Sequence, residues 1–278
     1  MQELRGMPVV KQIAEDMKVR MEQLAEKNIV PTLAVVRVGE REDDLSYERG
    51  LMKRFDAVGA LVKQVVFKED VTQEMLEEKI IELNQDKEIH GILVFRPLPK
   101  HLNEEKIKEL VSADKDVDCM GSINSAHVFA QDSKGHAPCT PQAVMEMLAF
   151  YNMELKGKKA VVVGRSMVVG KPLAMMLLKE NATVTICHTK TADLKKECLE
   201  ADYIFAAAGV AEMIDESFVR EGQVVIDVGI NMKDGKLCGD VKYDSVKEIV
   251  EAISPVPGGV GTVTTSVLLK HTVESAEK

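Results

Sequence analysis

The chain lacks tryptophan altogether, and aromatic residues make up only 4% of its 278 residues. Proteins that bind single-stranded nucleic acid stack its bases on aromatic side chains, so this composition disfavours such a binder. Acidic residues outnumber basic ones, and the formal net charge is −9 with the charges scattered along the chain. An acidic surface repels phosphate backbones and anionic lipids, and we therefore expect neither nucleic acid nor a membrane as a partner.

Long apolar runs and paired cysteines are also missing. No stretch approaches the roughly 18 residues of a membrane-spanning helix, and residues 1–5 lack the apolar core of a secretory signal. The cysteines are odd in number, dispersed and without a Cys-x-x-Cys pair, at Cys119, Cys139, Cys187, Cys198 and Cys238. This pattern indicates reduced thiols in a cytoplasmic protein rather than a disulfide framework. The sequence shows no cluster of metal ligands, and we expect no metal.

What is present is a regular alternation of strand-like and helix-like segments. Apolar runs predict strands at 32–38, 61–67, 91–94, 159–163, 183–187, 203–207 and 224–228. Helical periodicity predicts helices at about 10–24, 44–58, 72–83, 104–111, 170–180 and 263–276. Such alternation predicts an α/β fold in which parallel sheets are covered by helices on both faces.

The order of these segments predicts two α/β domains with a cleft between them, divided near residue 140. The first domain comprises residues 1–139, and the last helix is expected to return to it, so that it also takes 263–278. Residues 140–262 form the second domain, which is expected to be doubly wound and Rossmann-like.

A glycine-bearing turn, Gly164-Arg-Ser-Met-Val-Val-Gly170, lies after a strand and before a helix, where a dinucleotide site is expected. Glycine lets the backbone approach a pyrophosphate, and the helix N-terminus supplies N–H donors and a positive dipole. Ser166 holds the second glycine position of the common fingerprint, and Gly170 comes one residue late. Two interpretations stay open, a nucleotide site and an ordinary strand–turn–helix connection.

The next strand ends in Ile186-Cys-His-Thr-Lys190, without the carboxylate that NAD sites use to hold the ribose hydroxyls. His188, Thr189 and Lys190 offer hydroxyl and cationic donors, and Arg165 adds positive charge in the preceding turn. These groups suit the extra phosphate of NADP, with NAD as the alternative cofactor. The other interpretation is that His188 and Lys190 are solvated loop residues.

Three further features suit a flat ligand. The loop Pro255-Val-Pro-Gly-Gly-Val-Gly261 can let such a ligand lie against backbone. Tyr47 can stack on an aromatic ring, and Asp118 can accept two hydrogen bonds from an amidine-like edge. Taken singly, each also has a structural interpretation: a plain connection, a residue at the edge of the core, and a helix cap.

Together these motifs resemble the methylenetetrahydrofolate dehydrogenase/methenyltetrahydrofolate cyclohydrolase family over nearly the whole chain. The matching segments, in order, are Pro31-Thr-Leu-Ala, Ser46-Tyr47, Gly91-Ile-Leu-Val, Lys115-Asp-Val-Asp118, Cys139-Thr-Pro141, Val163-Gly-Arg-Ser166, Val169-Gly-Lys-Pro172, Asp227-Val-Gly-Ile230, Gly239-Asp-Val241 and Pro255-Val-Pro-Gly-Gly-Val-Gly261. The resemblance implies a cytoplasmic homodimer that binds folate on the first domain and NADP on the second. Bifunctional members oxidise 5,10-methylenetetrahydrofolate and then hydrolyse the methenyl product.

The resemblance also implies roles for individual residues. Tyr47 would stack on the folate and Asp118 would hold the pterin edge. The floor of the site near the nicotinamide would be formed by Pro257, Gly258 and Gly259. Cofactor binding would fall to Gly164, Arg165, Ser166, Gly170, His188, Thr189 and Ile230.

The sequence departs from the family where water is activated. The family has a lysine one helical turn after the tyrosine, and here that position is Leu51; its glutamine after Gly-Ile-Leu-Val is here Phe95. Neither replacement can accept or donate a proton. We therefore predict that the cyclohydrolase step is lost or weak. Milder departures are Cys119, Ala143, Thr262 and Val263, at positions where the family usually has other residues.

Three alternatives remain open. Lys53 or Arg96 could replace the missing lysine, which would make the enzyme fully bifunctional. The chain could be a catalytically silent paralogue that binds folate or nucleotide. It could also be a dehydrogenase for a different small substrate on the same architecture, since fold does not fix function.

Overall fold

The computed structural model describes residues 1–132 and 134–278 and divides the chain into two compact units. The six-stranded unit contains Met1–Lys11 and Thr140–Thr264, and the three-stranded unit contains Gln12–Cys139 and Thr265–Lys278. The boundaries fall inside three helices: α1 (Gly6–Ala25), α6 (Cys139–Phe150) and α10 (Val260–Ala276).

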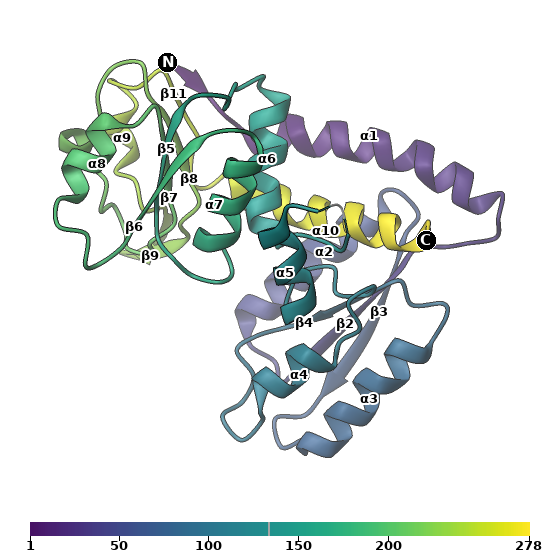
Figure 1. Cartoon of the computed structure of the whole chain (residues 1–278). Helices are drawn as coiled ribbons and strands as arrows, with labels where there is room; N and C mark the ends of the chain where they lie inside the picture. The colour runs from purple at the N-terminus through teal and green to yellow at the C-terminus, as the bar shows by residue number, and fades with distance from the viewer. Residues whose placement is uncertain (133) are drawn as a thin grey trace. The chain divides into compact units, whose positions relative to one another are not determined.

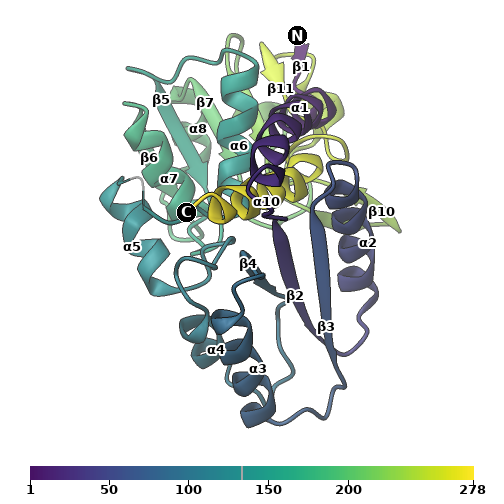
Figure 2. The same ribbon diagram turned by 90° about the vertical axis from the view of Figure 1, so that its right-hand side faces the viewer.

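The three-stranded unit is a parallel sheet in the order β3-β2-β4, covered by helices on both faces. Figure 2 shows α2 on one side of this sheet and α3 and α4 on the other. Its elements are β2 (Thr32–Val38), α2 (Glu42–Asp56), β3 (Leu61–Phe67), α3 (Gln73–Gln85), β4 (Gly91–Val94), α4 (Glu104–Leu110) and α5 (Ser122–Ala130). This arrangement places the segments that follow β2 and β4 at one edge of the sheet.

Strand β2 shows how the alternation of side chains builds this unit. Ala34 and Val36 are fully buried in a core cluster that also contains residues of α3 and α4. Arg37 points to the opposite face, where its Nε donates a hydrogen bond to Glu48 Oε2 of α2 at 3.2 Å. Both side chains of this ion pair are less than 10% exposed. The pair therefore holds α2, the helix that carries Tyr47, against the sheet.

The six-stranded unit is a parallel sheet in the order β1-β11-β8-β7-β5-β6. Figure 1 shows α8 and α9 on one side of it and α7 on the other. Its elements are β1 (Gln2–Glu3), β5 (Lys159–Val163), α7 (Gly170–Lys179), β6 (Thr183–Cys187), α8 (Leu194–Glu200), β7 (Tyr203–Ala206), the 3-10 turn Glu216–Phe218, β8 (Val224–Asp227), α9 (Tyr243–Val246) and β11 (Ala252–Ile253). An antiparallel hairpin, β9 (Asn231–Lys233) with β10 (Lys236–Cys238), follows β8.

The predicted α/β class is confirmed, and five predicted strands coincide with β2, β3, β4, β5 and β6. The sequence did not indicate α5, α6, α8, α9 or the short strands β1, β9, β10 and β11. In α3, the apolar side chains of Met75 and Ile81 are 54% and 42% exposed. Only Leu76, Ile80 and Leu83 of that helix are buried in the core. The buried face of α3 therefore takes up only some of its apolar residues.

The first residues of the chain fall in a different unit from the one expected. The sequence predicted 1–139 as one stretch, but contacts place Met1–Lys11 in the six-stranded unit. The physical reason is that β1 pairs in parallel with β11 and becomes an edge strand of that sheet. A two-residue strand carries too little periodicity to be seen in a sequence.

Of the helices in the two described stretches of the chain, none is long and apolar enough to cross a membrane.

Candidate functional site

The carboxyl edge of the six-stranded sheet gathers the segments that the sequence singled out. The last residues of β5, β6, β7 and β8 pair in register across the sheet. The segments that begin at Gly164, His188, Ala207 and Val228 therefore emerge at one edge. The chain runs from β5 to β6 on one side and returns to β7 on the other side of β5, so strand order reverses there. Open α/β sheets bind ligands at such a switch point.

The turn after β5 depends on its two glycines. Gly164 adopts φ +131°, and a Cβ at Gly164 would collide with the carbonyl oxygen of Ala207. A Cβ at Gly170 would collide with the carbonyl oxygen of Gly164. The Ser166 hydroxyl accepts hydrogen bonds from the backbone N–H groups of Val169, at 3.1 Å, and Gly170, at 3.4 Å. Ser166 therefore fixes the start of α7.

The segment after β6 presents donors at the same edge. The backbone N–H of Lys190 donates to Nδ1 of His188 at 3.0 Å, so the neutral ring carries its proton on Nε2. Arg165, Thr189 and Lys190 are exposed. This end of the sheet thus offers a hydroxyl, an imidazole N–H and two cations to a phosphate.

A small pocket of about 220 Å³ brings together two motifs that lie far apart in the sequence. Residues 227–230 form one wall, and residues 255–259, with Gly261 and Thr262, form another. Ile230 is 63% exposed at its rim. Gly258 adopts φ +106°, which favours glycine, and a Cβ at Gly259 would crowd the carbonyl oxygen of Pro255. The predicted residues Ile230, Pro257, Gly258 and Gly259 are therefore neighbours in one pocket.

Asp240 holds the loop after β7, a role that sequence reasoning missed. Its carboxylate accepts hydrogen bonds from the consecutive N–H groups of Ala208, Gly209 and Val210, at 2.6–2.9 Å. It also accepts one from Nδ2 of Asn231 at 2.9 Å. The sequence analysis included Asp240 in the segment Gly239-Asp-Val241, which matches the family, but assigned no role to it.

Asp227, at the end of β8, anchors the segment that carries Asp240. Its Oδ1 accepts from the N–H groups of Gly229 (3.1 Å) and Asp240 (3.0 Å), and its Oδ2 accepts from Val241 (2.9 Å). Burial raises the pKa of this carboxyl to about 7, and the nearby Asp240 charge acts in the same direction. The two aspartates thus tie together the loops that follow β7 and β8.

In the three-stranded unit, Tyr47 and the two departures from the family pattern lie together. Tyr47 and Leu51 are one turn apart on α2. The Tyr47 ring meets Phe95 edge-on, with centroids 5.8 Å apart and planes at 82°. Leu51 is fully buried, Phe95 is 9% exposed and Tyr47 is 37% exposed. One face of the tyrosine environment is therefore apolar.

The other predicted polar residues of this unit are placed as follows. Asp118 is half-buried, and its Oδ1 accepts a hydrogen bond from the N–H of Cys139, the first residue of α6, at 3.0 Å. This contact caps α6, which agrees with the structural interpretation of Asp118 as a helix cap. Lys53 is exposed, and Arg96 is half-buried directly after Phe95.

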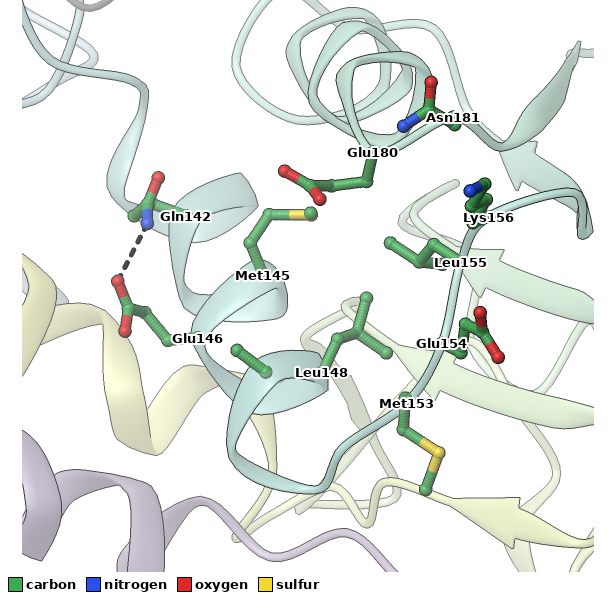
Figure 3. Close-up of a pocket in the computed structure, with 11 residues that line it drawn as sticks. Gln142, Met145, Glu146, Leu148, Met153, Glu154, Leu155, Lys156, Glu180 and Asn181 are labelled. Atoms are coloured by element: carbon green, nitrogen blue, oxygen red, sulfur yellow. Dashed lines mark hydrogen bonds between the residues drawn. The ribbon is translucent and has the colours of Figure 1, made fainter.

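A larger pocket of about 520 Å³ lies between α6, the end of α7 and residues 153–156 (Figure 3). None of the predicted site residues lines it. Three carboxylates face it, Glu146, Glu154 and Glu180, against the single cation Lys156 among its lining residues. This charge balance disfavours an anionic nucleotide, so volume alone would indicate the wrong site.

Comparison with known proteins agrees with this geometry. Residues 4–118 match the model of the catalytic domain of the tetrahydrofolate dehydrogenase/cyclohydrolase family, and residues 138–278 match that family's NAD(P)-binding domain. The bifunctional protein FolD of Carboxydothermus hydrogenoformans is 53% identical over 277 residues, covering 99% of this chain and 96% of the relative.

Solved structures give the same answer. The bifunctional enzyme FolD of Campylobacter jejuni superposes with a TM-score of 0.97 at 40% identity, covering 100% of this chain and 99% of the other. A methylenetetrahydrofolate dehydrogenase-cyclohydrolase of Trypanosoma brucei, complexed with NADP and an inhibitor, gives 0.92 at 34% identity, covering 98% and 96%. With both domain models matched in order, the chain belongs to the tetrahydrofolate dehydrogenase/cyclohydrolase family of enzymes and carries its NAD(P)-binding domain.

Proposed function

We propose that the chain is an NADP-dependent 5,10-methylenetetrahydrofolate dehydrogenase in which the cyclohydrolase step is lost or weak. The reaction transfers a hydride from the methylene carbon of the substrate and gives 5,10-methenyltetrahydrofolate. NADP, when bound, supplies the hydride acceptor. The chain's own residues have to bind and orient the ligands and keep water away from the reacting carbon.

The residues at the carboxyl edge of the six-stranded sheet support NADP as the cofactor. Gly164 and Gly170 keep side chains out of the turn, and the Ser166 hydroxyl fixes its shape, so a pyrophosphate can approach the backbone closely. Arg165 and the Nε2–H of His188 offer positive charge and a donor suited to an additional phosphate. The NADP-bound relative from Trypanosoma brucei supports the same assignment. We assign the pocket of Ile230 and Pro257–Gly259 to the nicotinamide end.

The three-stranded unit supports the folate assignment. Tyr47 is 37% exposed, so its ring can stack on a pterin, as the family resemblance implies. Asp118 uses Oδ1 for Cys139, and we assign its second oxygen to the pterin edge. The homodimer and the cytoplasmic location implied by the resemblance belong to the same proposal, and sedimentation velocity of the purified chain tests the first.

One observation carries the loss of hydrolysis: Leu51 is fully buried one turn after Tyr47, and Phe95 packs against the Tyr47 ring. Hydrolysis needs a group that takes a proton from water, within hydrogen-bond reach of the water that attacks the reacting carbon. Leucine and phenylalanine offer no such group, and they lower the water content around Tyr47. Hydride transfer needs no such proton acceptor, so it survives both replacements.

The second candidate is a fully bifunctional enzyme, which the names of the relatives favour. It would require a substitute for the missing lysine. Lys53 lies two residues beyond Leu51, so on a regular helix it points roughly 200° away from that position. Arg96 follows Phe95 directly, but a guanidinium stays protonated and cannot act as the base.

Paired rates on one purified sample test the proposal. One assay follows reduction of NADP, and separately of NAD, with 5,10-methylenetetrahydrofolate; the other follows decay of methenyltetrahydrofolate with and without the protein. We expect NADP reduction without accelerated decay. Acceleration of both reactions would establish the bifunctional enzyme, and no reduction with either cofactor would indicate the silent paralogue or a different substrate.

A further inference from the structure

Two buried histidines and a glutamate of the three-stranded unit meet at a place that the proposed reaction does not use. His136 and His271 are 5% and 4% exposed, and their rings stack with centroids 4.5 Å apart. One potential ligand atom from each histidine and from Glu274 lies within 4.8 Å of the others. His136 precedes α6, whereas His271 and Glu274 lie on α10.

The hydrogen bonds fix which nitrogen of His271 carries the proton. Nδ1 of His271 lies 2.9 Å from the carbonyl oxygen of Val117. A carbonyl oxygen can only accept, so Nδ1 carries the hydrogen and Nε2 keeps its lone pair. Metal-binding histidines show the same arrangement, in which a carbonyl orients the ring through the nitrogen that does not bind.

The same reasoning applies to His136. Its Nε2 lies 2.8 Å from Oγ of Ser275, and that hydroxyl donates its own proton to the carbonyl oxygen of Asp114 at 3.1 Å. Ser275 therefore accepts from Nε2–H, and Nδ1 of His136 keeps its lone pair. That lone pair faces Oε2 of Glu274 at 3.7 Å.

Each histidine of this cluster thus keeps one nitrogen lone pair, beside the carboxyl group of Glu274. Oε1 of Glu274 accepts a hydrogen bond from Nη1 of Arg20 at 3.4 Å. A buried group of acceptors is stabilised when a cation binds between them.

We propose that His136, through Nδ1, His271, through Nε2, and Glu274 bind a divalent cation of the zinc class. Two imidazole nitrogens and one carboxylate oxygen are ligands that zinc prefers, with water in the fourth position. Two ligand atoms on one zinc lie roughly 3.3 Å apart, so binding draws the three side chains closer than their present spacing. The Glu274 side chain is 30% exposed and provides the entrance.

Three nearby cations reduce the affinity without occupying the site. Arg20 donates a hydrogen bond to Oε1 of Glu274, Lys278 acts on His136 through its charge, and Lys270 acts on His271 in the same way. All three charges repel a divalent ion over a short distance. We therefore expect a site that chelators empty readily rather than one that survives them.

Zinc binding to the full chain, stripped with EDTA, tests this proposal. Equilibrium dialysis should give one saturable Zn²⁺ equivalent per chain, and bound Co²⁺ should show the spectrum of nitrogen and oxygen ligation. His136→Gln, His271→Gln and Glu274→Gln should each weaken binding at least tenfold. Because the histidines are buried, Glu274→Gln is the variant that keeps the test valid if the others do not fold.

A matched control is His127→Gln. His127 also pairs with a carboxylate, Asp132, at 3.0 Å, but lies outside the cluster. This control should bind zinc like the unaltered chain, and zinc should raise the unfolding temperature of both but not of Glu274→Gln. Absence of saturable binding, binding that is unchanged in Glu274→Gln, or a cobalt spectrum with thiolate charge transfer would overturn the proposal. None of these readouts depends on folate or NADP.

Discussion

At the scale of single residues, two buried aspartates hold the cofactor edge of the sheet together. Asp240 accepts hydrogen bonds from three consecutive backbone N–H groups of the loop after β7. Asp227 in turn anchors the segment that carries Asp240. The close approach depends on glycine, because a Cβ at Gly229 would collide with Asp240 and one at Gly239 with Asp227. Two carboxylates and the backbone N–H groups that donate to them thus fix the loops after β7 and β8.

The first prediction concerns the protonation of Asp227. Burial raises its pKa to about 7 in the folded chain, whereas the unfolded carboxyl titrates near 3.8. The native state therefore binds a proton that the unfolded state has lost, and this contribution to stability is full below about pH 4 and disappears as pH rises through about 7. Between these values the slope is about 1.4 kcal/mol per pH unit.

Asp227→Asn removes this titration. The urea midpoint of the unaltered chain minus that of the variant should fall steadily from pH 4 to pH 7 and then level off. Asp132→Asn, in which the native pKa of the replaced group is lowered instead, should show a nearly constant midpoint difference over this range, because that group titrates below about pH 4. For Asp227→Asn, a midpoint difference that does not change with pH would contradict the prediction.

The second prediction concerns Leu51 and Phe95. Leu51→Lys together with Phe95→Gln should create hydrolysis of methenyltetrahydrofolate, by about 10²-fold or more over the unaltered chain. The introduced lysine replaces a fully buried side chain, so desolvation lowers its pKa toward neutrality and makes it a better base. Dehydrogenase turnover should change far less than hydrolysis.

Met52→Lys is the matched control for that experiment. Met52 is the next residue of α2 and is 38% exposed, so it places a lysine on a different side of the same helix. It should leave methenyltetrahydrofolate decay at the background rate. Equal hydrolysis by Met52→Lys and the double variant would mean that the position of the lysine is irrelevant, and our account of the loss would be wrong.

At the scale of elements, the start of α7 packs its backbone directly against the turn that follows β5. Gly170 is its first residue and lies against the backbone of Gly164, so the helix N-terminus and the end of β5 approach without side chains between them. Ser166 accepts from the N–H groups of Val169 and Gly170. Helix, turn and strand therefore pack as one element, to which we assign the cofactor's pyrophosphate.

The third prediction is that Gly170→Ala damages this element. The added Cβ collides with the Gly164 carbonyl oxygen, which cannot move without the strand, and we expect a loss of about 1–3 kcal/mol in stability. NADP affinity should fall by more than tenfold, as measured by isothermal titration calorimetry. The unfolding temperature of the variant is measured as well, so that weaker NADP binding can be distinguished from a loss of folded protein.

Gly50→Ala serves as the control for that substitution. Gly50 is an exposed helical residue of α2, and a Cβ there meets nothing within 4 Å. The variant should be slightly more stable, by about 0.5–1 kcal/mol, with unchanged NADP affinity. If Gly170→Ala has the same stability and NADP affinity as Gly50→Ala, the close approach of Gly170 to Gly164 is not needed for cofactor binding.

At the scale of the whole molecule, the net charge of −9 opposes an anionic cofactor, so local donors must outweigh it. Arg165, Lys190 and the start of α7 at the carboxyl edge of the six-stranded sheet supply that local field. Salt screens the distant charges more effectively than the contacts at the site. We therefore expect cofactor preference to be decided at this edge and not by total charge.

The fourth prediction is that NADP stabilises the chain more than NAD at equal concentration. Saturation to about 100 times the dissociation constant contributes about 2.7 kcal/mol, or roughly 5–10 °C in unfolding temperature for a chain of this size. Arg165→Ala should reduce the NADP shift to that of NAD and leave the NAD shift unchanged. Equal shifts for both cofactors in the unaltered chain would remove NADP from the proposal.

The sequence by itself determined the α/β class, five strands to the residue and the glycines of the cofactor turn. These features are local: β-branched runs bounded by glycine and proline specify strands, and a positive φ or a close approach selects glycine wherever it occurs. The Asp240 contacts, the His136–His271–Glu274 cluster and the place of residues 1–11 were decided only by tertiary structure. Each joins segments far apart in the chain, and a single sequence carries periodicity but no record of which distant residues meet.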